Sequence, residues 1–365
     1  MQKNILVIWG GNSLEHEISI ITGIEAIHNM PIKGYKAIPI FWHKGKFYTG
    51  SELVDIKNYA KMNFDNIYEV FIVGSHLYRK TQLGRLKLVD KIDCALLTTH
   101  GGAGENGTLQ GFLASNYIPY TSCGVLQSAL CMDKYSTKLR LIADDINVVR
   151  GELLAKDFND EKIAEIEANL GYPLIIKPNS AGSSIGIAKA NNRAELAFAI
   201  DVGFKYDDFI LIEQYINDFI ELNIACVTIG GKVVLSEIER PITTSEILTF
   251  DDKYSLDETQ DIATREFPAN ISQTFAQKVK DITTKVYKSL ALTGIVRIDY
   301  LLKGDILYLN EINTIPGSLS HYLFDNMSYS ELLTKLLTET IKNGCVKEIK
   351  YTTDILSNFN GVKYK

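Results

Sequence analysis

The chain has 365 residues, a length that predicts two or three domains. Hydrophobic residues make up 46% of it and charged residues 22%, which is the composition of a globular protein and excludes global disorder. The 38 basic and 44 acidic side chains give a net charge of −6, so neither nucleic acid nor an anionic membrane is an expected partner. No apolar run approaches the ~18 residues of a membrane span, and the first residues lack the features of a signal peptide.

The first third of the chain alternates strands with helices. Strands are predicted at 5–9, 35–42 and 94–98 and a helix at 17–28, with glycine-rich turns after the first and last strands, whereas residues 51–88 follow no clear pattern. Repeated strand, glycine turn and helix favour a parallel sheet with helices on its faces.

The rest of the chain combines helices with antiparallel strands. Helices are predicted at 123–143, 159–169, 194–204, 270–290 and 330–342, and strands at 172–177, 187–189, 209–215, 294–302 and 306–311, with a meander around residues 230–231. Five widely spaced cysteines form no CxxC pair: Cys94, Cys123, Cys131, Cys226 and Cys345. They predict neither a disulfide framework nor a zinc site, and a reducing cytoplasm is the expected location.

The most specific local pattern is Arg297-Ile298-Asp299 followed by Glu311-Ile312-Asn313. Side chains alternate along a strand, so Arg297 and Asp299 share one face, as do Glu311 and Asn313. If the two strands pair as a hairpin, three oxygen ligands converge with one guanidinium, a set that suits Mg²⁺. Taken alone, the pattern is also typical of a salt-bridged surface hairpin.

Lys177 precedes a loop rich in serine and glycine, residues 180–186, between two predicted strands. Backbone amides of such a loop can cradle phosphate oxygens, and a strand lysine adds a positive charge. The loop lacks the Gly-Lys-Ser/Thr ending of a Walker A motif. By itself, a flexible hairpin turn is an equally good interpretation.

Two glycine-rich segments follow strands in the first third of the chain. Residues 10–17 open a helix whose amides can bind a carboxylate, although an ordinary strand–helix turn capped by Ser13 explains them as well. His100 begins the second segment, 100–108, where glycines allow the backbone to approach a ligand closely. A histidine in such a place is more often structural than catalytic.

Together and in this order, these residues resemble the D-alanine–D-alanine ligases, members of the ATP-grasp superfamily. The similarity extends from Ile5 to about Leu337. The matching stretches are Gly10-Gly11-x-Ser13-x-Glu15-His16-Glu17-x-Ser19, Gly107-Thr108-Leu109-Gln110-Gly111, Ile118-Pro119-Tyr120-Thr121, Met132-Asp133-Lys134, Lys177-Pro178, Gly182-Ser183-Ser184-x-Gly186, Lys253-Tyr254, Arg297-x-Asp299 and Glu311-x-Asn313-Thr314-x-Pro316-Gly317.

The resemblance implies an α/β ATP-grasp architecture with three domains. They are an N-terminal parallel α/β substrate-binding domain (1–122), a central ATP-grasp subdomain (123–212) and a C-terminal catalytic subdomain (213–346), followed by a tail of no assigned role (347–365). ATP lies between the last two domains. The implied activity is ATP-dependent ligation of two D-alanines through an acyl phosphate, giving D-alanyl-D-alanine for peptidoglycan precursors. ATP is a substrate, two Mg²⁺ ions (or Mn²⁺ in their place) are the metals, and a homodimer is the implied assembly.

The resemblance also implies a role for individual residues. ATP contacts fall to Lys134, Lys177, Ser184, Glu213 and Glu221, and the Mg²⁺ ligands are Asp299, Glu311 and Asn313. Glu17 holds the ammonium of the first D-alanine in a hydrogen-bonded triad with Ser183 and Tyr254, while Arg297 and the Gly317 amide stabilise an oxyanion. Further substrate contacts are His100, Lys253, Ser320, Tyr322 and Leu323.

Tyr322 departs from the family pattern, which usually has a serine there that binds the carboxylate of the second substrate. Either the ring turns away and Ser320, Arg297 and backbone amides receive this carboxylate, or the ring narrows the pocket and the acceptor is small. We favour the first interpretation, with D-alanine as the acceptor. The alternative function is a related ATP-grasp dipeptide ligase with a different acceptor amino acid.

Two further classes of protein are disfavoured. Tyr254 is absent from relatives that join D-lactate, so its presence here favours an amine as the nucleophile. A non-catalytic nucleotide-binding scaffold has no need of the full set of lysines, metal ligands and Arg297 that the sequence retains.

Overall fold

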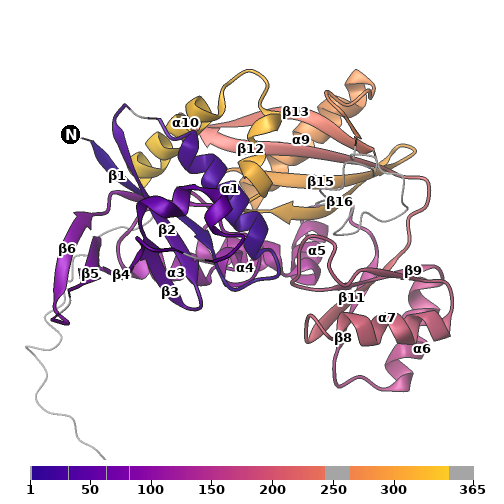
Figure 1. Cartoon of the computed structure of the whole chain (residues 1–365). Coiled ribbons are helices and arrows are strands. Elements are labelled where there is room, and N and C mark those ends of the chain that lie inside the picture. The colour runs from indigo at the N-terminus through magenta and orange to yellow at the C-terminus, as the bar shows by residue number, and fades with distance from the viewer. Residues whose placement is uncertain (1, 32, 63, 82, 243–263, 345–365) are drawn as a thin grey trace, which may run out of the picture.

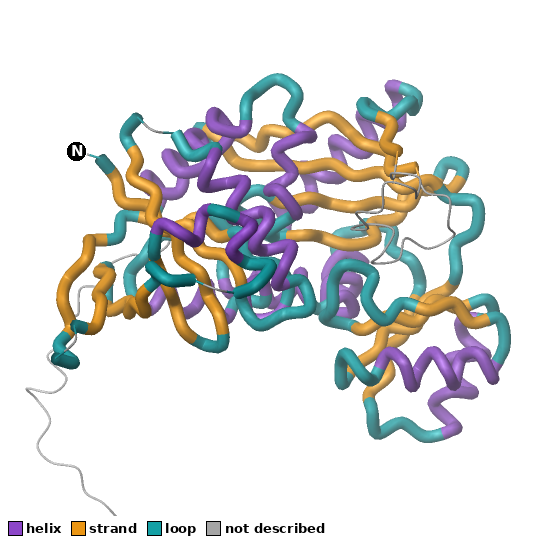
Figure 2. The backbone as a smooth tube through the Cα atoms, viewed as in Figure 1, coloured by secondary structure: helices purple, strands orange, loops and turns teal. Residues whose placement is uncertain are grey.

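The computed structural model describes residues 2–31, 33–62, 64–81, 83–242 and 264–344. Three β-sheets with their helices make up the structure (Figure 1). The smallest sheet and its two helices project from the rest, as the tube in Figure 2 shows. Buried apolar residues gather in three clusters.

The first sheet has seven strands in the order β6-β5-β4-β3-β2-β1-β7. They are β1 (Lys3–Gly10), β2 (Tyr35–His43), β3 (Lys46–Thr49), β4 (Tyr68–Val73), β5 (His76–Lys80), β6 (Leu86–Lys91) and β7 (Cys94–Leu97). From Ile5 to Trp9, β1 is a continuous apolar run that lies buried, and the strand runs parallel to its neighbours β2 and β7. Strands β3 to β6 are antiparallel. The sheet is therefore mixed rather than wholly parallel, because residues 46–91 add hairpins instead of strand–helix–strand units.

Helix α1 (His16–His28) follows β1 through a glycine turn and packs on the first sheet. Gly10 has φ +92°, and a Cβ on it would lie 2.4 Å from the carbonyl oxygen of Trp42, so this turn requires glycine. The shorter helices here are η1 (Ser51–Val54), η2 (Ile56–Asn58), α2 (Gly102–Glu105) and α3 (Thr108–Ser115).

The second sheet has the order β10-β9-β11-β8 and is antiparallel throughout. Its elements are β8 (Gly151–Ala155), α6 (Asp160–Leu170), β9 (Leu174–Pro178), β10 (Ala188–Ala190), α7 (Arg193–Gly203) and β11 (Phe209–Gln214). Both helices begin after an asparagine cap, because Asn159 and Asn192 accept hydrogen bonds from backbone amides of the first turn. The loop after β9 joins antiparallel strands, as the sequence predicts.

The third sheet has the order β14-β13-β12-β15-β16. Its strands are β12 (Ile220–Ile229), β13 (Lys232–Ile242), β14 (Thr264–Glu266), β15 (Val296–Lys303) and β16 (Ile306–Asn313), and the amphipathic helix α9 (Gln273–Ser289) packs against it. The predicted β15–β16 hairpin is confirmed. Its register pairs Arg297 with Asn313 and Asp299 with Glu311.

Three segments pack outside the sheet nearest to them in sequence. The stretch 123–143, predicted as one helix, forms two helices, α4 (Val125–Met132) and α5 (Lys134–Ile142). The break falls at Asp133, whose side chain caps α5 by accepting a hydrogen bond from the Ser136 amide at 2.7 Å. Residues of both helices share the hydrophobic cluster of the third sheet. The turn η3 (Gly317–Leu323) and α10 (Tyr329–Asn343) instead join the cluster of the first sheet. A boundary after residue 212 falls inside β11, and the division into domains stays a prediction.

None of the helices in the described part of the chain is both long and apolar enough to cross a membrane. Four of the five cysteines lie in this part and are buried with free thiols: Cys94, Cys123, Cys131 and Cys226. Cys345 lies outside the described residues.

Candidate active site

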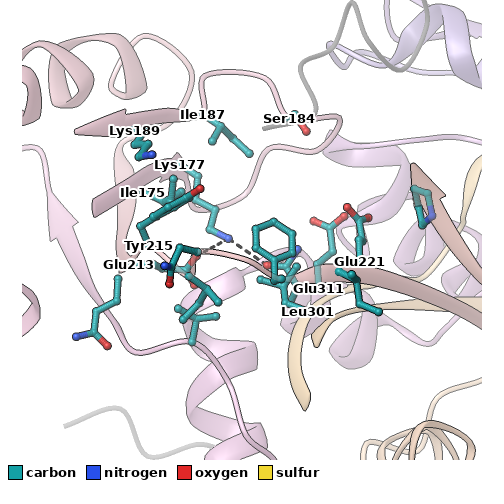
Figure 3. Close-up of a pocket in the computed structure, with 18 of the residues that line it drawn as sticks. Ile175, Lys177, Ser184, Ile187, Lys189, Glu213, Tyr215, Glu221, Leu301 and Glu311 are labelled. Atoms are coloured by element: carbon teal, nitrogen blue, oxygen red, sulfur yellow. Dashed lines mark hydrogen bonds and ion pairs between the residues drawn. The ribbon is translucent and has the colours of Figure 1, made fainter. Parts of the chain in front are cut away.

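A cavity of about 640 Å³ lies between the second and third sheets. Strands β9 and β11 with the loop after β9 line one side, and β12, β13, β15 and β16 line the other (Figure 3). Aliphatic and charged side chains share the wall, among them Ile175, Ile187, Leu301, Lys177, Lys189, Glu221 and Glu311. This volume and mixed lining are typical of a small-molecule site.

Two lysines converge on the buried carboxylate of Glu213 in β11. Lys177 Nζ lies 2.5 Å from Glu213 Oε2 (Figure 3) and 3.4 Å from Asn310 Oδ1. Lys138 pairs with the other Glu213 oxygen. Burial by itself would raise the pKa of Glu213, but the two ammonium groups outweigh it and lower this pKa. Glu213 therefore stays ionised and holds the Lys177 ammonium at the cavity wall.

Lys134 stands at the start of α5 and reaches the loop after β9. Its Nζ donates a hydrogen bond to the carbonyl oxygen of Ala181 at 2.5 Å. The same loop places Ser183 and Ser184 in the left-handed region, with φ of 51° and 58°. A backbone turned in this way can present amide groups to an anion, and Lys134 adds positive charge beside them.

Lys134 also borders a second, smaller pocket of about 40 Å³. Its wall includes Glu15, Glu105, Gly182, Glu311 and Asn313. Because Lys134, Gly182 and Glu311 border both cavities, the two spaces share a wall. A reaction that passes a group from one ligand to another needs such adjacent spaces.

Arg297 and Asp299 form a buried, two-pronged ion pair on β15. Arg297 Nε and Nη2 each lie 2.7 Å from an Asp299 oxygen, and Asn313 Nδ2 donates to Asp299 at 3.0 Å. Glu311 lies opposite Asp299 across the strand pair and faces both cavities. Asp299 therefore neighbours both Glu311, which borders the two cavities, and Asn313, which borders the smaller one.

This donor set fits Mg²⁺ by its chemistry. In the parts of the chain that the structure describes, no three His, Cys, Asp or Glu side chains cluster as a metal site. Two carboxylates and one amide oxygen are nevertheless hard ligands, and Mg²⁺ usually completes its shell with substrate phosphates and waters.

The carboxylate beside Ser183 belongs to Glu15, not to the predicted Glu17. Ser183 Oγ donates a hydrogen bond to Glu15 Oε1, and a Cβ on Gly182 would lie only 2.7 Å from Glu15 Oε2. Helix α1 begins at His16, so Glu15 stands at the junction that faces the pocket. Glu17 lies in the first helical turn and is exposed to solvent. The prediction for Glu17 is corrected to Glu15.

Two family models match most of the chain: D-ala D-ala ligase N-terminus over residues 4–123 and D-ala D-ala ligase C-terminus over residues 142–338. The chain belongs to the D-alanine–D-alanine ligase family. A relative named D-alanine–D-alanine ligase from Caldicellulosiruptor bescii is 36% identical, with 96% of this chain and 98% of the relative covered. One of the same name from Thermosipho melanesiensis is 35% identical, with 92% of each covered.

Solved structures agree with this family. The D-alanine–D-alanine ligase from Helicobacter pylori is similar with a TM-score of 0.75 and 29% identity, covering 93% of this chain and 98% of that one. VanG D-Ala:D-Ser ligase from Enterococcus faecalis gives a TM-score of 0.79 at 30% identity, covering 93% of this chain and 99% of that one. The predicted α/β ATP-grasp architecture is confirmed.

Several residues expected from the ligase family line the large cavity. They are Lys134, Lys177, Ser184, Glu213, Glu221 and Glu311. A Cβ on Gly317 would meet no atom within 4 Å, so a ligand has room to approach the backbone at this position. Lys253 and Tyr254 lie outside the described residues.

Three of the predicted substrate contacts are buried within the protein. His100 is 4% exposed, and its two ring nitrogens have partners in the chain, Ile315 O at 2.7 Å and Thr22 Oγ1 at 2.8 Å. Ser320 and Leu323 are fully buried, and Leu323 belongs to the core of the first sheet. Neither cavity described above includes these three residues in its wall, and their contact with a substrate stays a prediction.

Tyr322 points inward rather than away from the site. The positive charge of the nearby Arg297 partly offsets the rise in the pKa of Tyr322 that burial causes. The Arg265 guanidinium lies 4.8 Å from the centre of the Tyr322 ring and pairs with Glu239 at 3.3 Å. This inward position favours the interpretation in which the ring narrows the acceptor pocket, and the contact of Tyr322 with the acceptor stays a prediction.

Sequence reasoning missed Glu15, Lys138 and Arg265. Glu15 lies in the quoted motif, and the helix start would have separated it from Glu17. Lys138 lies four residues after Lys134 and so on the same helix face, which was a usable signal. Arg265 lies in a polar stretch without a pattern, and only its packing on Tyr322 reveals it.

Proposed function

We propose that this protein joins two D-alanine molecules with ATP, through an acyl phosphate, to give D-alanyl-D-alanine for peptidoglycan synthesis. One observation carries the proposal. The large cavity lined by Lys134 and Lys177 and the small pocket lined by Glu15 share a wall that includes Glu311. Asp299 is the strand partner of Glu311, and it is hydrogen-bonded to Arg297 and Asn313. A phosphoryl group on one side can thus reach a carboxylate on the other.

ATP is assigned to the larger cavity. Its base and ribose lie among the aliphatic wall and Glu221, and its phosphates extend towards Lys134, Lys177 and the amides around Ser184. Glu213 supports this grip by fixing Lys177. Lysines that neutralise the phosphates lower the barrier to phosphoryl transfer, which depends on positioning and charge stabilisation.

Asp299, Glu311 and Asn313 would hold two Mg²⁺ ions, with ATP oxygens completing the coordination. When bound, these ions supply charge neutralisation for the moving γ-phosphoryl group. Arg297 keeps Asp299 oriented through two hydrogen bonds.

The first D-alanine is assigned to the smaller pocket, with its ammonium at Glu15 and Ser183. Its carboxylate attacks the γ-phosphorus, ADP leaves, and the acyl phosphate forms. A carboxylate alone is a poor acyl donor, because its leaving group would be an oxide. The amine of the second D-alanine then attacks the acyl carbon, and inorganic phosphate leaves. Arg297 and the Gly317 amide stabilise the oxyanion of that step, for which one donor is worth about 3 kcal/mol.

D-alanine is the proposed acceptor, and Tyr322 is the proposed reason. Its ring is fixed between Arg265 and Arg297, where it takes up space and offers a hydroxyl to the acceptor carboxylate. A narrowed pocket of this kind selects a small amino acid. The curated relatives named above carry the name D-alanine–D-alanine ligase, which favours the same acceptor.

We assign the enzyme to the cytoplasm, where ATP is present. The four described cysteines with free thiols suit that reducing compartment. A homodimer is the assembly that family membership suggests.

The deciding experiment is ADP release by the purified chain with D-alanine, glycine, D-serine, L-alanine and D-lactate as single substrates and as pairs. Dipeptide formation, identified by mass spectrometry, should be fastest with D-alanine alone and should require Mg²⁺. Faster ligation of D-alanine to another acceptor would contradict the assignment. ATP binding without turnover on any substrate would favour a scaffold.

A further inference from the structure

Three consecutive non-glycine residues after Gly317 have left-handed backbone conformations. Ser318, Leu319 and Ser320 have φ angles of 48°, 47° and 48°. Each such residue costs about 1–2 kcal/mol, so a run of three persists only where surrounding contacts hold it. The turn connects Gly317 to Tyr322, which are the proposed oxyanion donor and acceptor contact.

One hydrogen-bonded chain reaches this turn from the first sheet and α1. His100 Nδ1 lies 2.7 Å from the carbonyl oxygen of Ile315, and His100 Nε2 lies 2.8 Å from Thr22 Oγ1. A carbonyl oxygen can only accept, so Nδ1 carries the proton. Burial lowers the pKa of His100 to about 4, so the ring is neutral at pH 7 and Nε2 accepts from the Thr22 hydroxyl.

The Thr22 hydroxyl closes this chain on the strained turn. Its oxygen accepts a hydrogen bond from the Ser318 amide at 3.1 Å while its proton goes to His100. Thr22 is 1% exposed, so no solvent competes for either bond. One buried hydroxyl therefore attaches both the residue before Pro316 and the first left-handed residue to α1.

Helix α1 is a rigid base for this attachment. A Cβ on Gly23 would lie 2.5 Å from Trp9 Cβ, so the helix packs directly on β1. Further along α1, Glu25 pairs with His321 at 2.8 Å, which adds a second link to η3. On the other side of the segment, Glu105 accepts from the Ile315 amide at 2.9 Å and from the Thr314 hydroxyl at 3.1 Å.

We propose that Thr22 is a positioning residue for ligation, whose hydroxyl fixes the Ser318–Ser320 turn and thereby places the Gly317 amide and Tyr322. This inference rests on the proposed function. Thr22 borders neither cavity described above and touches no reacting group. Its effect is geometric, and it falls on the acceptor side of the site rather than on the ATP side.

Two substitutions separate the hydroxyl from the rest of the side chain. Thr22→Val keeps the shape but leaves the Ser318 amide without an acceptor and His100 Nε2 without a donor. Thr22→Ser keeps the hydroxyl and removes only a methyl group. The assay measures kcat, the KM for each D-alanine site and the KM for ATP, with the thermal midpoint of each variant as a control for folding.

Thr22→Val should lower kcat by about 10- to 100-fold and raise the KM for the second D-alanine, because a small displacement of catalytic groups can cost that much. The KM for ATP and the first D-alanine should stay within about twofold, and Thr22→Ser should recover most of the loss. If Thr22→Val does not fold, Thr22→Ala takes its place in the same comparison with Thr22→Ser.

Two results would overturn the inference. One is wild-type kinetics in the variant that lacks the hydroxyl. The other is a loss of activity in which the KM for ATP and for both D-alanine sites rises equally, and in which the size of the loss tracks the fall in the thermal midpoint of both variants. Failure of the wild-type chain to release ADP with D-alanine would refute the proposed function itself, and so is distinguishable from either result.

Discussion

The Glu15 carboxylate and the Ser183 hydroxyl are hydrogen-bonded to each other although 168 positions separate them in the sequence. The bond joins the start of α1 to the loop after β9, and hence the first sheet to the second. Glu15 borders the proposed D-alanine pocket, and Ser184, the next residue of the loop, borders the proposed ATP cavity. This loop therefore connects the proposed D-alanine pocket with the proposed ATP cavity.

Glu15→Gln should weaken the binding of the first D-alanine, because the glutamine amide keeps the shape of the side chain but loses the negative charge that faces the substrate ammonium. A hydrogen bond to a charged group is worth about 1.5–3 kcal/mol, so the KM for the first D-alanine should rise by about 10- to 100-fold. Glu17→Gln is the matched control, since Glu17 is exposed, and it should leave the kinetics unchanged. Steady-state kinetics with both variants decide the matter, and a larger effect at Glu17 would restore the original motif assignment.

Arg297→Lys should lower turnover far more than ATP affinity. Lysine keeps the positive charge but lacks the planar fork that makes two bonds to Asp299 at 2.7 Å. Loss of one oxyanion donor typically costs about 100- to 1,000-fold in kcat. Turnover and ATP affinity are measured separately, by ADP release and by calorimetric titration with a non-hydrolysable ATP analogue. A parallel fall in ATP affinity would place Arg297 in the phosphate grip instead.

Local patterns in the sequence predicted most strands and helices that form the site. The β15–β16 hairpin follows from alternating apolar residues on either side of Lys303-Gly304-Asp305. Alternation puts Asp299 and Glu311 each on a definite face of its strand, but their pairing also depends on a register shift between Asp299 and Tyr300 that the sequence does not reveal. The hairpins that β4, β5 and β6 form were missed, because these strands are short and their sequences show no regular alternation of apolar and polar residues.

The roles of single polar residues were harder to predict, because they depend on partners far away in the sequence. His100 resembles a substrate contact in its motif, yet Ile315, its partner, is 215 positions away. The orientation of Tyr322 likewise depends on Arg265 and Arg297, which come from two other strands. No spacing rule encodes such contacts, so only the packed structure reveals them.

Tyr322→Ser should relax the choice of acceptor. The ring fills space between Arg265 and Arg297, and serine removes most of that volume while keeping a hydroxyl. The kcat/KM ratio of D-valine or D-serine to D-alanine as acceptor should rise by about 10-fold, which corresponds to the value of one or two methylene groups in a pocket. Tyr322→Phe is the control, because it keeps the ring and should keep the exclusion of D-valine. If D-valine is still rejected after Tyr322→Ser, the ring does not limit the pocket.

The last prediction concerns two buried groups that titrate in opposite directions. Burial lowers the pKa of His100 from 6.5 to about 4. Burial and the nearby charge of Glu15 raise the pKa of Glu105 from 4.5 to about 7. Between pH 4 and 6.5 the unfolded chain binds more protons at His100, so this group makes the protein less stable as pH falls. Between pH 4.5 and 7 the folded chain binds more protons at Glu105, so this group makes the protein less stable as pH rises.

The two slopes oppose each other between pH 4.5 and 6.5, and each is at most about 1.4 kcal/mol per pH unit. In urea unfolding followed by tryptophan fluorescence, His100→Asn should therefore give a stability that falls relative to wild type as pH rises through this window. Glu105→Gln should give the opposite slope. Both tryptophans of the chain, Trp9 and Trp42, lie in the first sheet and report on this part of the protein. Parallel pH profiles for wild type and both variants would mean that neither group titrates as its surroundings require.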